Sequence, residues 1–115
     1  MSKFSFVVCA VAGLLLSQLS FGAVDVAKAK KLATKKMCLA CHAIDKKLVG
    51  PAYKAVAKKY NEEDEKYKND KGAAVKMLSN KIRKGGSGNW GAIPMPPNPM
   101  SEDEAKLLVE WILSM

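Results

Sequence analysis

Histidine and cysteine, two residue types that often bind metals and cofactors, are scarce in this chain. Its 115 residues include one histidine and three cysteines. A structural zinc site usually needs four cysteine or histidine ligands, whereas Cys38, Cys41 and His42 supply only three. The remaining cysteine, Cys9, lies in an apolar run near the start of the chain. This scarcity argues against a structural zinc site.

The chain also lacks the patterns of sheet-containing or multidomain proteins. No apolar run alternates for long enough to predict a β-sheet, and there is no internal repeat. All three phenylalanines fall within the first 22 residues. The rest must build its core from aliphatic side chains with two tryptophans and three tyrosines. A domain this small is marginally stable unless a bound group adds apolar surface.

The first 22 residues have the layout of a secretory signal peptide. Lys3 is their only charge, and an apolar run from Phe4 to Leu16 follows it. This run is too short to remain as a permanent membrane anchor. We therefore expect residues 1–22 to be removed on export to the periplasm, and residues 23–115 to form one domain.

Helical periodicity in the remaining chain predicts about four short helices and an all-α fold. The expected helices run from an N-cap at Asp25 to Met37, over Ala52–Tyr60, over Ala73–Lys84, and from Ser101 onward. Inward positions are expected at Val26, Ala29, Leu32, Ala33 and Met37, and at Ala52, Val56 and Tyr60. Ser101 and Glu104 form a capping box, and residues 61–65 are expected to be a solvated loop or a fraying helix end.

The most informative motif is Cys38-Leu39-Ala40-Cys41-His42, because Cys-x-x-Cys-His is the attachment sequence of a c-type haem. The two thiols can add to the haem vinyl groups, and the adjacent histidine then reaches the iron. A thioredoxin-like redox pair would need a βαβ unit that the pattern does not support. A plain disulfide between the two thiols is a further alternative. The motif predicts one covalently bound haem c per chain and a role in electron transfer.

A low-spin haem iron in an electron carrier needs a sixth ligand. With no second histidine, the natural donors are a methionine thioether or, less often, a lysine amine. Met95 lies between Pro94 and Pro96, whose fixed φ angles make a stiff loop that suits a permanent ligand. Met100 directly precedes a helix cap, where apolar packing is the ordinary role. We predict Met95 as the ligand and keep Met100 as the alternative.

These motifs together resemble the short single-haem class I cytochromes c of the bacterial periplasm. The resemblance covers Cys38–His42, Val49–Tyr53, Gly88–Asn98 and the capped last helix. It implies a compact class I fold wrapped around one haem. Cys38 and Cys41 would form the covalent links, and His42 and Met95 would be the axial iron ligands.

The resemblance also implies roles for neighbouring residues. The carbonyl of Pro51 would accept a hydrogen bond from His42, Trp90 would donate its indole N–H to a haem propionate, and Asn98 would lie near the Met95 sulfur. Lys81 stands where some relatives place an arginine that pairs with a propionate, and Arg83 follows shortly after. Either cation is a candidate for that contact.

The formal net charge is +8, and Lys3 contributes one of these charges. Nucleic acid is not an expected partner, because the chain is exported and has no recognisable nucleic-acid motif. We expect the lysines to steer a monomeric carrier towards acidic patches on transient redox partners, such as a terminal oxidase, a reductase or a quinol-oxidising complex. The function predicted is non-enzymatic. The alternatives are a haem peroxidase-like enzyme, which a rigid methionine loop disfavours, and a haem subunit of a larger redox complex.

Overall fold

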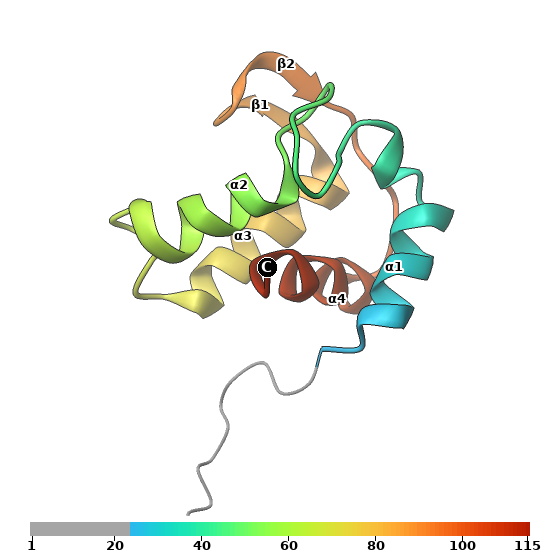
Figure 1. The fold of residues 1–115 in the computed structure, drawn as a ribbon, viewed down its shortest axis with the longest axis horizontal. Coiled ribbons are helices and arrows are strands. Elements are labelled where there is room, and N and C mark those ends of the chain that lie inside the picture. Colours follow the sequence, from blue (N-terminus) through green and yellow to red (C-terminus); the bar gives the residue numbers. More distant parts are fainter. Residues whose placement is uncertain (1–23) are drawn as a thin grey trace, which may run out of the picture.

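The computed structural model describes residues 24–115, so the predicted signal peptide lies outside the described residues. Four helices dominate this part of the chain: α1 (Val26–Lys35), α2 (Tyr53–Lys58), α3 (Lys71–Lys84) and α4 (Glu102–Leu113). Figure 1 shows them with a small hairpin at one edge. Within residues 24–115 there is no helix with the length and apolar character needed to cross a bilayer. The predicted all-α class with four short helices is confirmed.

Helix α1 begins at its predicted cap, where the Asp25 carboxylate accepts a hydrogen bond from the Lys28 N–H at 3.0 Å. Ala29 and Ala33 lie on its inner face and are fully buried. Small side chains at these two positions let α1 pack closely against α4. The cap and the centre of the helix therefore follow the sequence pattern.

The prediction that Val26 and Met37 lie on the inward face of the first helix is wrong. Val26 is 43% exposed and Met37 is 73% exposed. Met37 lies beyond the helix, because α1 ends at Lys35 and Met37 adopts the left-handed conformation with φ of 60°. That conformation turns the chain into η1 (Cys38–Ala40), a single 3₁₀ turn that carries the first thiol.

Helix α2 continues past its last α-helical residue into η2 (Lys59–Glu63), a π-helical turn. Residues 61–63 therefore form a helix end, which is one of the two conformations expected for residues 61–65. Ala52, Val56 and Tyr60 are buried, as predicted. This face of α2 and η2 forms part of the core.

Helix α3 begins at Lys71, earlier than predicted, because the Asp70 carboxylate caps it by accepting from the Ala73 N–H at 3.0 Å. Gly85 ends the helix at the predicted place, with φ of +72°. A glycine adopts this left-handed conformation without the steric cost that other residues incur. The chain can therefore reverse immediately into the hairpin.

The hairpin was not predicted. β1 (Gly86–Gly88) pairs with β2 (Gly91–Met95) in an antiparallel arrangement whose register is irregular. The glycine-rich first strand has no alternating apolar side chains that would signal a strand. The hairpin projects from the end of α3 and lies near the segment before α2 (Figure 1).

Helix α4 is the centre of the fold because it packs against α1, α2 and α3. Its predicted capping box is present: the Ser101 hydroxyl accepts from the Glu104 N–H, and the Glu104 carboxylate accepts from the Ser101 N–H, both at 3.1 Å. Leu108, Val109 and Trp111 are buried on its inner side. Part of this core around α4 also lines a cleft.

Candidate functional site

A cleft of about 290 Å³ lies between α2, the hairpin and the segment that follows η1. This volume is near the lower end of the roughly 300–1,000 Å³ typical of small-molecule and cofactor sites. Apolar side chains of α2, η2, α3 and α4 contribute to its wall: Val56, Tyr60, Leu78, Ile82, Leu108, Val109 and Ile112. Cys38, Cys41, His42 and Met95 line the same cleft. Residues that are far apart in the sequence are thus brought together around an apolar space.

The two thiols are placed together by the turn η1. The Cys41 N–H donates to the Cys38 carbonyl at 3.2 Å, which fixes the spacing of the two residues. Both thiols are free and half-buried. Burial raises the pKa of the Cys38 thiol above its ordinary value. This pair suits two thioether links to a group held in the cleft.

The imidazole of His42 is held from three directions. Its Nδ1 lies 2.8 Å from the Pro51 carbonyl oxygen, within hydrogen-bond distance. Its ring stacks on Tyr53 with the centroids 5.2 Å apart. A Cβ atom on Gly50 would lie 2.4 Å from the His42 Cε1, so only glycine leaves room for the ring here. With Nδ1 engaged, Nε2 is the nitrogen left to bind a metal.

Met95 ends strand β2, is half-buried and packs against the core. The Met95 backbone lies directly against the end of α3, where a Cβ on Gly85 would be 2.5 Å from the Met95 carbonyl oxygen. Met100, the alternative ligand, also packs on the core but does not line the cleft. Of the two candidate methionines, the geometry therefore favours Met95.

Trp90 lines the cleft from the tip of the hairpin and is 41% exposed. The Lys59 ammonium lies 4.6 Å from the centroid of its ring and donates to the Asn89 carbonyl at 3.1 Å. The Tyr60 and Trp90 rings pack edge to face with their centroids 6.5 Å apart. These contacts attach the hairpin to η2. The propionate contact expected for the indole stays a prediction.

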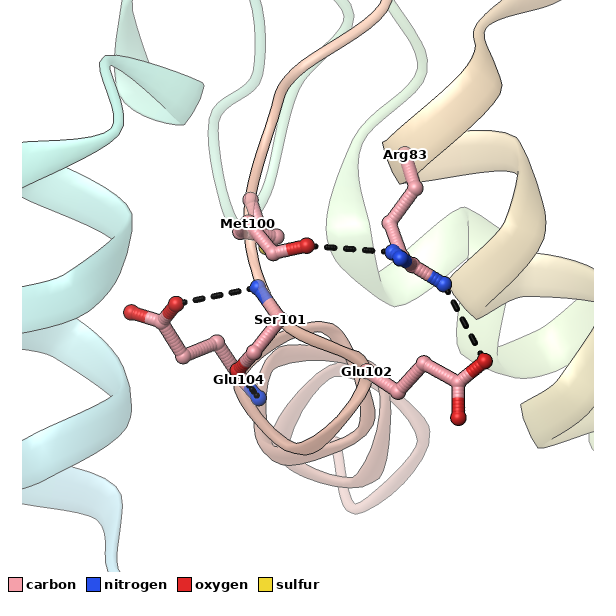
Figure 2. A network of polar contacts seen from close by, with 5 residues as sticks. All are labelled: Arg83, Met100, Ser101, Glu102 and Glu104. Atoms are coloured by element: carbon pink, nitrogen blue, oxygen red, sulfur yellow. Dashed lines mark hydrogen bonds and ion pairs between the residues drawn. The ribbon is translucent and has the colours of Figure 1, made fainter.

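The structure separates the two cations that the sequence left as alternatives. Lys81 lines the cleft. Arg83 is used elsewhere: its Nε donates to the Met100 carbonyl at 3.0 Å, and its Nη1 donates to Glu102 at 3.2 Å (Figure 2). Lys81 is therefore the one positioned to meet an anionic group in the cleft.

Asn98 lies outside the lining of the cleft. Its side-chain amide donates to the Lys36 carbonyl at 2.8 Å, and its backbone N–H donates to the Ile82 carbonyl at 2.9 Å. These bonds anchor the segment that follows Met95. The contact expected between Asn98 and the Met95 sulfur stays a prediction.

Sequence reasoning missed four residues that shape the site: Gly50, Tyr53, Lys59 and Gly85. Two of them had a local signal, since Gly50 precedes the proline of a recognised motif and Gly85 ends a predicted helix. The contact between Lys59 and Trp90 had none, because it depends on how η2 and the hairpin meet. The donor set fits a covalently bound haem: two free thiols, one oriented imidazole and one thioether border an apolar cleft.

The comparisons with known proteins identify a family that binds the same cofactor. A family model described as cytochrome c matches residues 26–115. The chain is 51% identical over 85 residues to cytochrome c-551 of Azotobacter vinelandii, which covers 74% of this chain and 94% of that protein. It is 49% identical over 86 residues to cytochrome c-552 of Hydrogenobacter thermophilus, covering 75% and 80%.

Solved structures give the same result for the fold. The crystal structure of wild-type Nitrosomonas europaea cytochrome c552 matches with a TM-score of 0.62 and 45% identity, covering 74% of this chain and 96% of that one. A class 1 cytochrome from Sideroxydans lithotrophicus matches with a TM-score of 0.62 and 34% identity, covering 80% and 97%. The chain therefore belongs to the cytochrome c family, whose members carry covalently bound haem c, and it is one of the small class I cytochromes that transfer electrons.

Proposed function

We propose that the protein is a periplasmic, monomeric carrier of single electrons that binds one haem c through Cys38 and Cys41, with His42 and Met95 as axial ligands. The observation that supports this most strongly is the position of these four side chains around one apolar cleft. Bound haem iron would supply the one-electron ferric/ferrous couple.

The residues around the cleft suit electron transfer without substrate binding. The hydrogen bond to the Pro51 carbonyl orients the His42 ring and raises its basicity as a ligand. A Met95 thioether favours the ferrous state, and the apolar wall excludes water. The prolines that flank Met95 restrict its movement when the iron changes charge. A stiff pair of ligands keeps the structural change on electron transfer small.

The same features argue against the peroxidase-like alternative. Such an enzyme needs an iron position that is open or easily vacated, with a polar group poised beside it. This chain contains a single histidine, and the Pro51 carbonyl already engages its ring. A methionine held in a proline-rich segment leaves little room for substrate.

Partner docking is proposed at the mouth of the cleft. Val49 and Ile93 line the cleft and are 55% and 67% exposed, so an apolar rim faces outward. Lys47 and Lys81 lie in the same lining. Cations around an apolar rim favour fast, short-lived association with an acidic patch on a redox partner.

The ligand assignment is tested by comparing Met95→Ala with Met100→Ala in the holoprotein. We expect the weak far-red ferric absorption band that reports methionine–iron bonding to disappear in Met95→Ala and to persist in Met100→Ala. Met100→Ala is a matched control because both methionines pack on the core. Survival of the band in Met95→Ala would overturn the assignment.

The docking proposal is tested by the ionic-strength dependence of electron transfer to an acidic redox protein. We expect the rate to fall steeply with salt, and Lys47→Gln to lower both the rate and its salt dependence. Lys106→Gln is the control, because this lysine lies on α4, outside the cleft lining, and pairs with Glu110. A rate that is insensitive to salt would contradict steering.

Export and attachment are tested together by intact-mass measurement on protein from the periplasmic fraction. The expected mass is that of a chain beginning near residue 23 plus one haem. A chain that retains residues 1–22, or one that loses its haem under denaturing conditions, would contradict the corresponding part of the proposal.

A further inference from the structure

The segment that follows Met95 has few backbone hydrogen-bond donors of its own. Residues 94–100 contain four of the five prolines of the chain, and proline has no backbone N–H. Carbonyl groups in such a segment must find donors in other parts of the molecule. The side chains that provide these donors therefore determine where the segment lies.

Two hydrogen bonds connect this segment to the end of α1, and both involve Lys36. The Lys36 ammonium donates to the Pro99 carbonyl at 3.1 Å. In return, the Lys36 carbonyl accepts from the Asn98 side-chain amide at 2.8 Å. Lys36 is the C-cap residue of α1 and closely precedes Cys38. This Lys36 clasp thus joins the segment that carries Met95 to the segment that carries the thiols.

The other side of the segment is attached to α3. The Ile82 carbonyl accepts from the Asn98 N–H at 2.9 Å, and Arg83 donates to the Met100 carbonyl at 3.0 Å. Figure 2 shows Arg83 reaching across to Met100 beside the cap of α4. With α3 holding one side, the Lys36 clasp is what holds the segment to α1.

We propose that Lys36 is a positioning residue for Met95. Its clasp keeps residues 96–100 against α1, so that the Met95 thioether stays directed into the cleft. A hydrogen bond from an ammonium group is stronger than one between neutral groups, and it cannot be replaced from within the proline-rich segment. The inference rests on the proposed ligation by Met95 and adds the group that keeps that ligand in place.

Helix α1 offers a matched control for this role. Lys35 is exposed and immediately precedes Lys36, whereas the contacts to residues 98 and 99 are made by Lys36. Replacing either Lys35 or Lys36 with methionine lowers the net charge by the same amount. The pKa of Glu104 is lowered mainly by the hydrogen bond from the Ser101 N–H, and to a smaller extent by the charges of both Lys36 and Lys35. An effect on the α4 cap must therefore be separated from an effect on Met95.

The experiment titrates the ferric holoprotein with imidazole, which competes with the methionine for the iron, and follows loss of the far-red band. Met95 must detach before imidazole binds, so a looser segment gives tighter apparent binding. We expect Lys36→Met to tighten imidazole binding by about tenfold, Lys35→Met to change it less than about twofold, and Lys36→Arg to restore most of the wild-type value.

Two outcomes overturn the proposal. Equal imidazole affinities in Lys36→Met and Lys35→Met would show that the Lys36 ammonium does not hold Met95 in place. The proposal is also overturned if Ser101→Ala, which removes the α4 cap, tightens imidazole binding as much as Lys36→Met does. The two variants are compared at equal loss of unfolding free energy. If the wild-type protein has no methionine–iron band, the proposed ligation fails first. A band that is present but insensitive to Lys36 contradicts the clasp alone.

Discussion

The segments that carry His42 and Met95 are fixed in different ways. Around His42 the hydrogen bonds join residues that are close in the sequence and involve backbone groups. The Pro51 carbonyl engages the ring, and the Gly50 N–H donates to the Cys41 carbonyl at 2.8 Å. Around Met95 the segment depends on long-range contacts, two of them from the charged side chains of Lys36, the C-cap of α1, and Arg83 in α3. Salt or the loss of a single cation should therefore disturb the methionine side before the histidine side.

The largest effect is expected from Gly85→Ala, which acts on the methionine side. The new Cβ would lie 2.5 Å from the Met95 carbonyl oxygen, at a residue with φ of +72°. Left-handed strain and forced displacement of backbone together should lower the unfolding free energy by about 3 kcal/mol. Denaturant unfolding of the holoprotein measures this, together with weakening of the far-red band.

Gly88→Ala is the control for Gly85→Ala. Gly88 has φ of +107°, but a Cβ there would meet nothing within 4 Å. It therefore carries conformational strain without a collision, and the far-red band should be unchanged. Equal effects of the two substitutions on the band would show that contact with Met95 is not the cause.

Gly50→Ala, on the histidine side, should lower the unfolding free energy by a smaller amount, about 2 kcal/mol. The added Cβ would lie 2.4 Å from the His42 Cε1 and would displace the ring from Pro51. The far-red band should weaken less than in Gly85→Ala, because Met95 itself is not moved. Gly72→Ala is the control: its Cβ would be 3.7 Å from the nearest atom, inside α3, and should stabilise the protein.

Ser101→Ala should lower the unfolding free energy by about 1 kcal/mol, because it removes the N-cap of α4. The cap directly follows the proline-rich segment, and the loss is expected in α4 itself. Thermal unfolding measures the loss. Ser114→Ala, at the other end of α4, is the control, and a larger loss there would contradict the importance of the N-terminal cap.

The smallest effect concerns pH. The hydrogen bond from the Ser101 N–H holds the pKa of Glu104 below its ordinary value. A lowered folded-state pKa means that the stabilisation is present above the unfolded-state pKa, about 4.3, and is lost as the pH falls through the folded-state pKa. Glu104→Gln should flatten this acid dependence of the unfolding free energy. An unaltered acid limb in Glu104→Gln would contradict the assignment.

The parts that sequence predicted well are those set by local rules. Asp25 and Ser101 begin helices because their side chains accept from N–H groups within the first turn, and this depends only on nearby residues. The attachment motif could be recognised for the same reason, since its spacing is local, and Met95 was singled out by its flanking prolines, although its ligation stays a prediction. The helical class followed from periodicity.

The parts that sequence could not predict depend on packing. The glycine-rich strand Gly86–Gly88 pairs with β2 at the place where α3 ends against the Met95 backbone, and that contact has no local signal. Whether Lys81 or Arg83 reaches the cleft depends on which face of α3 meets α4, and their spacing alone did not decide it. Lys36 looked like one more surface lysine, since its partners lie more than 60 positions away in the chain.

The concentration of prolines beside Met95 has a consequence for competition between ligands. Each proline limits the conformations open to the segment when it detaches, so the thioether remains near the position it left. A tethered ligand of this kind acts at an effective concentration of millimolar or more, on the order of that found for short linkers. With Met95 as the proposed iron ligand, small molecules that bind ferric iron would have to exceed that local concentration, and this would protect the carrier from adventitious ligands in the medium.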